Sequence, residues 1–196
     1  MTVAQEVAGE RRALYLLLAR VFAREPDGPF LESLKSSGLR AEMERRGFGW
    51  EGDAETLAVE YTRLFIGPGP HASLYGSVNS ERPGDEGRLW GDSTVKVKQT
   101  IEAAGLSFVP GYGGIPDHLA VELEFLARVA EAQDRADAEE DAATAAALGA
   151  FRRGFIHDHV LNWLPAFAEK VGELNPHPFY SGFVRFCREW IESDGR

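Results

Sequence analysis

The chain has 196 residues, of which 44% are hydrophobic and 27% charged, and its net charge is −10. These values are typical of a globular protein with one large domain, and they exclude a disordered chain or one too short to bury a core. The acidic balance argues against a general nucleic-acid binder, and the single cysteine, Cys187, excludes an internal disulfide and a cysteine-rich zinc site.

The charge is unevenly distributed along the chain. Residues 1–50 carry a net charge of +1, residues 51–150 carry −11, and residues 151–196 are neutral. The acidic middle either attracts a basic partner or serves as a solubilising surface, and both interpretations stay open here. The short apolar run near the N-terminus has no basic region before it and is followed by Arg20 and Arg24. We therefore expect neither a signal peptide nor a membrane span, and we predict a cytoplasmic protein.

Helical periodicity begins close to the N-terminus. Apolar residues between positions 14 and 22 recur at spacings of three and four, which predicts a buried helical face. The turn Asp27-Gly28-Pro29 ends this helix and begins a second one, which stops near Gly38. A short helix is predicted over residues 40–46, and Asp53 is placed to cap the next.

Residues 67–91 form the longest interruption of this pattern, with the sequence GPGPHASLYGSVNSERPGDEGRLWG. No periodicity survives in the segment, and loops of this length are uncommon inside a compact domain unless they have a function. We therefore expect a long functional loop at this position.

The second half of the chain returns to helix. The pattern predicts one helix over residues 92–105, another opened by Pro116 and Asp117, an alanine-rich helical region over 131–147, and further helices beginning at Pro165 and after the turn at 175–178. Alternating strands and fixed-period repeats are both missing from the sequence. We predict an all-α fold in which residues 1–196 form a single globular domain of about eight to ten helices.

The sequence offers little for catalysis. The glycine-rich GPGP and GYGG segments lack the lysine of a phosphate-binding loop, and neither a zinc-protease HExxH motif nor a G-x-S-x-G nucleophile elbow is present. From these motifs we predict no catalytic residue, no metal site and no cofactor. One enzymatic alternative stays open, a metal-dependent enzyme that uses His118 and Glu122, which lie four residues apart on a predicted helix.

Two features could instead bind a peptide. Asp117 is either the N-cap of the helix that follows, with His118 as its first residue, or a ligand-binding residue together with His118. Tyr75 and Trp90 lie in or beside the long loop, where aromatic pockets could hold apolar side chains. Carboxylates that could pair with arginines occur in the same region; they are Glu60, Asp85, Glu86 and Asp92.

Several short segments also follow one another in a recognisable order. They are EYTRLFIG at 60–67 with PHASLY at 70–75, LWGDST at 89–94, IPDHLAVELEFL at 115–126, HVLNWLPAF at 159–167 and HPFY at 177–180. The ordered set resembles the motifs of the TorD/DmsD family of redox-enzyme maturation chaperones and covers the chain from about residue 13 to 191. The chain departs from the family at His71, where the family often has tryptophan, and at Leu74, which replaces valine.

The resemblance implies an all-helical cytoplasmic chaperone without catalysis. Such proteins bind the twin-arginine leader, and sometimes the body, of a molybdopterin oxidoreductase subunit and hold it for cofactor insertion before export. The family's peptide-binding residues correspond to Asp117 and His118, and also to Tyr75, Trp90 and Glu122. We expect carboxylates including Asp117 to meet the leader arginines, and Tyr75 and Trp90 to contact its apolar stretch.

Two points stay open at this stage. The protein could be a scaffold that binds the folded oxidoreductase body without reading its leader. Because relatives occur both as monomers and as domain-swapped dimers, either state is compatible with the resemblance.

Overall fold

The fold is seen in a computed structural model that describes residues 3–36, 44–45, 52–80, 82–85, 87–109 and 114–196. Within these ranges every regular element is helical, and the β contact there is an isolated antiparallel bridge between Tyr75 and His118. The predicted all-α class is confirmed, and nine α-helices in the described ranges agree with the expected eight to ten.

In chain order the α-helices are α1 (Val3–Ala23), α2 (Gly28–Ser36), α4 (Ala54–Tyr61), α5 (Gly76–Asn79), α6 (Asp92–Ala103), α7 (Leu119–Ala138), α8 (Ala142–Phe155), α9 (Leu164–Glu173) and α10 (Pro178–Asp194). Two π-helical turns extend α4 and α8, and they are η1 (Thr62–Ile66) and η2 (Ile156–Val160).

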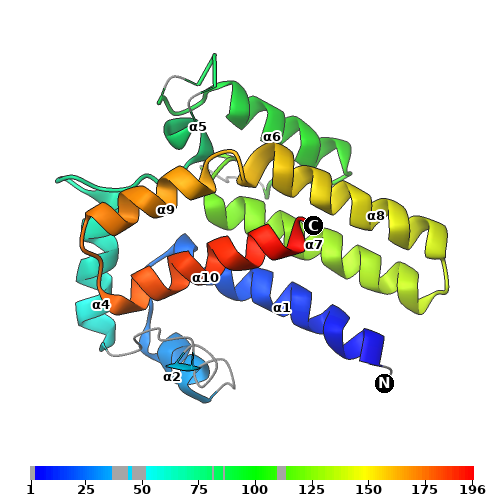
Figure 1. Cartoon of the computed structure of the whole chain (residues 1–196), viewed down its shortest axis with the longest axis horizontal. Coiled ribbons are helices and arrows are strands. Elements are labelled where there is room, and N and C mark those ends of the chain that lie inside the picture. The colour runs from blue at the N-terminus through cyan, green and yellow to red at the C-terminus, as the bar shows by residue number, and fades with distance from the viewer. Residues whose placement is uncertain (1–2, 37–43, 46–51, 81, 86, 110–113) are drawn as a thin grey trace.

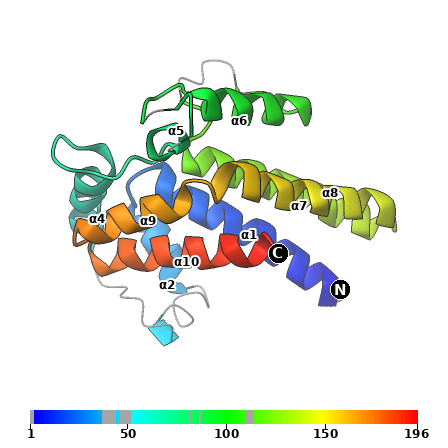
Figure 2. The same cartoon turned by 45° about the horizontal axis from the view of Figure 1, so that its top comes forward.

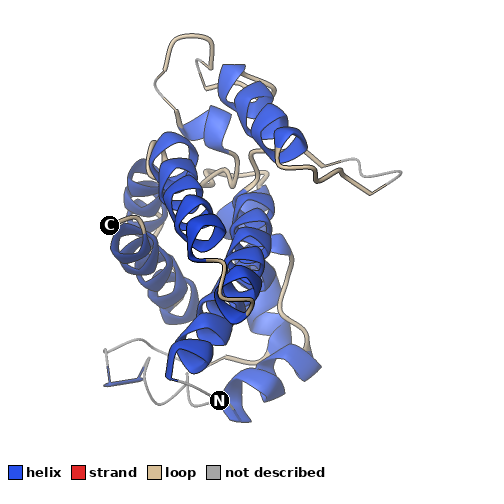
Figure 3. Cartoon of the chain, turned by 90° about the vertical axis from the view of Figure 1, so that its right-hand side faces the viewer, coloured by secondary structure: helices blue, strands red, loops and turns tan. Residues whose placement is uncertain are grey.

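The long helices form a bundle. Helix α1 packs along α7, and α7 and α8 form an antiparallel pair, as do α9 and α10 (Figure 1). Helix α4 stands at one end of the bundle, where α9 and α10 meet. Helices α5 and α6 form a separate layer over α7 and α8, and α2 lies on the opposite side of the molecule (Figure 2). Seen from the side, the bundle lies between these two outer parts (Figure 3).

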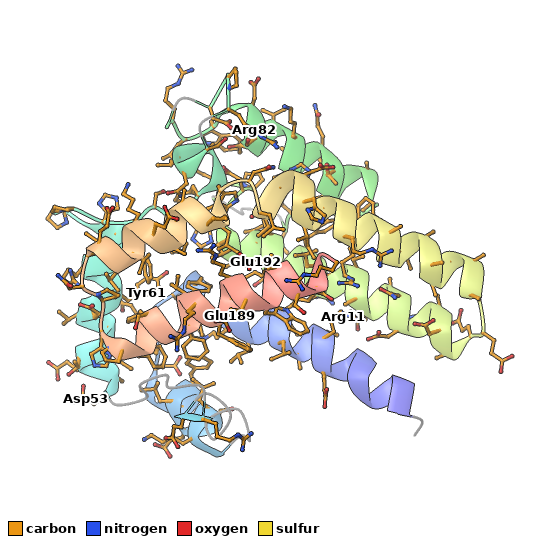
Figure 4. The ribbon with its side chains drawn as sticks, in the orientation of Figure 1. Arg11, Asp53, Tyr61, Arg82, Glu189 and Glu192 are labelled. Carbon is orange, nitrogen blue, oxygen red and sulfur yellow. The ribbon has the colours of Figure 1, made fainter. Side chains whose placement is uncertain are left out.

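One cluster of buried hydrophobic side chains runs through the bundle, and its aromatic end lies next to α4. The Phe65 ring stacks on Phe167, with ring centroids 6.1 Å apart, and meets Tyr61 edge-on at 5.2 Å. Tyr61 points from α4 toward the interior (Figure 4), and its hydroxyl donates a 2.8 Å hydrogen bond to the carbonyl of Phe22 on α1. The polar tip of this buried tyrosine thus has a partner, and it joins α4 to α1.

A buried ionic cluster lies near the middle of the bundle, where α10 ends (Figure 1). Arg152 on α8 is 3% exposed and pairs with Asp194, the last residue of α10. The same carboxylate accepts hydrogen bonds from the Tyr15 hydroxyl and from the side chain of Arg11 on α1, which is labelled in Figure 4. The cluster therefore joins three helices that are far apart in the sequence.

Several predicted helix boundaries are confirmed. The Asp53 side chain accepts the amide of Thr56 at 2.7 Å and caps α4, and Pro165 lies in the first turn of α9. The helical region predicted over 131–147 is interrupted, however, because α7 ends at Ala138, Glu140 has a φ of 59°, and Asp141 caps α8. Most of the predicted helix over 40–46 lies outside the described residues.

The 67–91 segment contains one helical turn, α5, that the sequence pattern did not predict. This turn depends on a tertiary contact, because the amide of Ser77 in α5 donates to the side chain of Asp117, forty residues away in sequence. The pattern of neighbouring residues carries no information about such a partner.

No helix among the described residues is both long and apolar enough to cross a bilayer.

Candidate functional site

The candidate site is built where the long loop meets the start of α7. The amide of Gly76 donates to the carbonyl of Asp117, and the amide of Leu119 donates to the carbonyl of Leu74, both at 2.9 Å. These two bonds form the isolated bridge that sets Tyr75 opposite His118, with their rings edge-to-face and their centroids 5.0 Å apart. We call this pairing of residues 74–76 with 117–119 the joint.

His118 is the N-cap of α7. Its Nδ1 accepts the amide of Ala120 at 3.1 Å, which places the ring proton on Nε2. The prediction that Asp117 caps this helix, with His118 as its first residue, is therefore wrong, and α7 begins at Leu119. Burial lowers the pKa of His118 to about 4, against the opposing effect of the nearby Asp117 charge. At neutral pH the ring is uncharged and offers one donor, Nε2–H.

Asp117 lies beneath the joint. It is 0% exposed, and its Oδ2 accepts the amide of Ser77 at 2.6 Å. The expectation that this carboxylate meets a leader arginine is corrected by its burial, because an arginine of a bound peptide cannot reach it in this conformation. The carboxylate instead holds the first turn of α5 against the start of α7.

Glu122 is the second buried carboxylate of the site. It is 1% exposed, and in the described part of the chain neither of its oxygens has a hydrogen-bond partner. Burial, and next the charge of Asp117, raise the pKa of Glu122 well above its usual range. The nearby Trp163 indole lowers this pKa by a smaller amount. Like Asp117, Glu122 is closed off from a peptide arginine.

The metal-dependent alternative is not supported by this geometry. His118 precedes the helix that carries Glu122, and its Nδ1 is already bonded to a backbone amide. Among the described residues, no three metal-binding side chains lie close enough to share an ion.

Two residues of the site escaped the sequence analysis, Gly76 and Trp163. A Cβ added at Gly76 would lie 2.9 Å from the Trp163 indole nitrogen, so the loop can approach this buried ring only because position 76 has no side chain. Trp163 lies inside one of the segments that carried the family resemblance, and Gly76 directly follows another. Gly76 and Trp163 contribute to the site by packing closely against each other, not by binding a ligand or reacting.

Trp90 lies apart from the joint. It is 58% exposed in a left-handed conformation with φ of 62°, and it does not line the pocket described below. The other carboxylates of the region are engaged elsewhere, since Asp85 is buried against the amide of Ser93 and Glu60 pairs with Arg63. Asp92 is exposed in the first turn of α6, and Glu86 lies outside the described residues.

An open pocket of about 410 Å³ lies beside the joint. One wall is aromatic and apolar, and it includes Tyr61, Phe65, Tyr75 and His118. The other wall comes from the turn after α1, and it contributes Arg24, Glu25 and Asp27. This charged wall could not be predicted from the sequence, because the turn lies 34 to 94 residues from Tyr61 and His118 of the opposite wall and carries no motif that indicates binding. The pocket places aromatic side chains next to carboxylates, which suits a cationic or mixed basic-apolar ligand.

Comparison with known proteins gives three consistent results. The sequence model of the family described as the nitrate reductase delta subunit matches residues 31–169. The chain is 27% identical to chaperone protein TorD of Shewanella pealeana, over 94% of this chain and 87% of that protein. It is 32% identical to chaperone protein TorD of Vibrio cholerae, over 70% of this chain and 60% of that protein.

A solved structure is similar over nearly the whole chain. The crystal structure assigned as a redox enzyme maturation protein from Archaeoglobus fulgidus has a TM-score of 0.57 and 25% sequence identity, and the match covers 93% of each chain.

Proposed function

We propose a specific task for this chain on the basis of its family. The chain belongs to the TorD/DmsD family of redox-enzyme maturation chaperones, as its match to the nitrate reductase delta subunit family model and its similarity to the TorD chaperones indicate. It binds the twin-arginine leader of a molybdopterin oxidoreductase catalytic subunit in the cytoplasm and holds it for cofactor insertion before export. The relatives are named as chaperones, and the task involves binding without catalysis. The whole chain acts as one helical chaperone domain.

The observation that carries this proposal is the pocket beside the joint. Leader peptides place arginines next to an apolar stretch, and the pocket places carboxylates next to aromatic rings. The uncharged state of His118 favours a cationic ligand, because a protonated ring in the wall would repel it. Its Nε2–H can then donate to a peptide carbonyl.

The five residues singled out from the sequence divide into two roles under this proposal. Tyr75 and His118 line the pocket and contact the leader. Asp117 and Glu122 are buried behind them, and Asp117 holds the joint in shape through its bond to the amide of Ser77. Trp90, outside the pocket, contacts the apolar stretch further along the leader.

Calorimetric titration with a synthetic twin-arginine leader tests the proposal. We expect binding to the unmodified protein, weaker binding to His118→Ala and Tyr75→Ala, and weaker binding of a peptide whose two arginines are replaced by glutamine. A protein that does not bind the leader, or that binds the glutamine version equally well, contradicts the proposed function.

A second candidate function has its own support. Leu89, Trp90 and Val95 are 50%, 58% and 44% exposed at the start of the α6 layer, and none of them lines the pocket. Exposed apolar groups of this kind could receive the folded body of the oxidoreductase. Pull-down with a client that lacks its leader separates the two functions, because capture of the leaderless client requires a surface other than the leader pocket.

A further inference from the structure

We infer that Glu25 is the carboxylate that receives an arginine of the bound leader. This inference rests on the proposed function and names the residue through which the pocket distinguishes arginine from lysine. Glu25 follows the last turn of α1 and lies outside every segment that carried the family resemblance.

The first step is to ask which carboxylates near the pocket can be reached. Asp117 and Glu122 are 0% and 1% exposed, and Asp117 already accepts a backbone amide. A buried carboxylate could pair with a peptide arginine only if the joint opened, which would break the two backbone bonds between residues 74–76 and 117–119. Two exposed carboxylates remain in the pocket wall, Glu25 and Asp27.

Asp27 is already fully engaged. Its Oδ2 pairs with Arg20 at 2.9 Å and with Arg24 at 3.7 Å, while its Oδ1 accepts the amide of Phe30 at 2.8 Å. That amide, aided by Arg20, holds the pKa of Asp27 below its usual range. A peptide arginine would have to displace an existing cation from this carboxylate.

Glu25 has the opposite arrangement. It is exposed, and within the described part of the chain it has no ion-pair partner. Its Oε1 accepts the hydroxyl of Thr62 at 3.0 Å, which ties the side chain to η1 and leaves Oε2 open. The backbone around it is also fixed, since the Arg20 side chain donates to the carbonyls of Arg24 and Glu25, at 3.2 Å each.

The position of Glu25 relative to the aromatic wall suits a guanidinium. Burial first, and then the Glu25 charge, raise the pKa of the Tyr61 hydroxyl, so the field of the carboxylate reaches the ring that lines the pocket. Arg20 and Arg24 both pair with Asp27, so Glu25 is the carboxylate of the pocket wall that has no ion-pair partner among the described residues. A guanidinium can donate two parallel hydrogen bonds to a carboxylate while its flat face packs against a half-buried ring such as that of Tyr75, and a lysine ammonium can do neither.

The test is a comparison of peptides and variants by calorimetric titration. The peptides are a twin-arginine leader and two versions in which one arginine or the other is changed to lysine. We expect Glu25→Gln to weaken binding of the twin-arginine leader about tenfold, because a charge-assisted pair is lost. We also expect it to reduce the preference for arginine over lysine at one of the two positions. Thr62→Val, which frees Oε1, should reduce the same preference by a smaller factor.

A matched control is available on α6. Glu102→Gln removes the same charge from a surface residue that pairs with Lys98 and does not line the pocket, and it should leave binding unchanged. If the unmodified protein binds the leader but Glu25→Gln binds it equally, with the arginine preference intact, the assignment of Glu25 is wrong and the proposed function stands. If the unmodified protein binds none of the peptides, the proposed function fails and the assignment fails with it.

Discussion

The buried position of Asp117 leads to a prediction that separates a structural role from a ligand-binding role. In Asp117→Ala the amide of Ser77 loses the carboxylate that accepts its hydrogen bond at 2.6 Å in the interior. A hydrogen bond to a charged group contributes about 1.5–3 kcal/mol, and the amide left behind has no route to water. We therefore expect the free energy of unfolding to fall by about 2–3 kcal/mol. Asp117→Asn keeps an acceptor of the same shape and should cost about 1 kcal/mol.

Urea unfolding followed by circular dichroism measures this loss. With a typical slope of about 2 kcal/mol per molar urea, a loss of 2 kcal/mol moves the midpoint by about 1 M. Hydrogen exchange at the Ser77 amide should speed up more than exchange in the core of α7, because the change begins at the joint.

The matched control is an exposed carboxylate of the same region. Glu25→Gln should change stability by less than about 0.5 kcal/mol and should weaken leader binding, the reverse of the pattern expected for Asp117→Ala. An Asp117→Ala protein that is as stable as the original but fails to bind the leader would refute the reasoning, since it would show that the carboxylate contacts the peptide directly.

Three further changes test the packing around the site and the bundle. The raised pKa of Glu122 means that protonation favours the folded state, so stability should fall by about 1.4 kcal/mol per pH unit as pH rises from the ordinary glutamic acid pKa toward the folded one. Glu122→Gln should remove that slope in urea unfolding between pH 5 and 8, and an unchanged slope would contradict it. Arg152→Met should lower the free energy of unfolding by about 3 kcal/mol in thermal unfolding, because it breaks a buried ion pair with Asp194. The loss is limited because Arg11 still contacts that carboxylate. Adding Asp194→Asn should restore part of the loss, and no recovery would count against the ion pair. Gly76→Ala should cost about 1–3 kcal/mol and alter Trp163 fluorescence, because its methyl group would overlap the indole; equal stability would show that the ring has room to move.

The sequence determined the helices and the family. Helical periodicity depends on residues three and four apart, so the all-α class and the starts of α2, α4 and α6 could be predicted without any tertiary information. The ordered motifs likewise placed Tyr75 and His118 in one family pattern, and the structure sets their rings 5.0 Å apart.

Only the tertiary structure decided which of the acidic residues are accessible. Asp117, Glu122 and Glu25 carry the same chemical group, and nothing in their local sequence says that the first two are buried while the third borders an open pocket. Burial depends on which segments pack together, and here the partners are 36 to 93 residues apart. For the same reason the sequence could not show that Trp90 lies outside the pocket, or that His118 rather than Asp117 caps α7. Local patterns determine secondary structure, whereas the exposure of a charge depends on what the rest of the chain places over it.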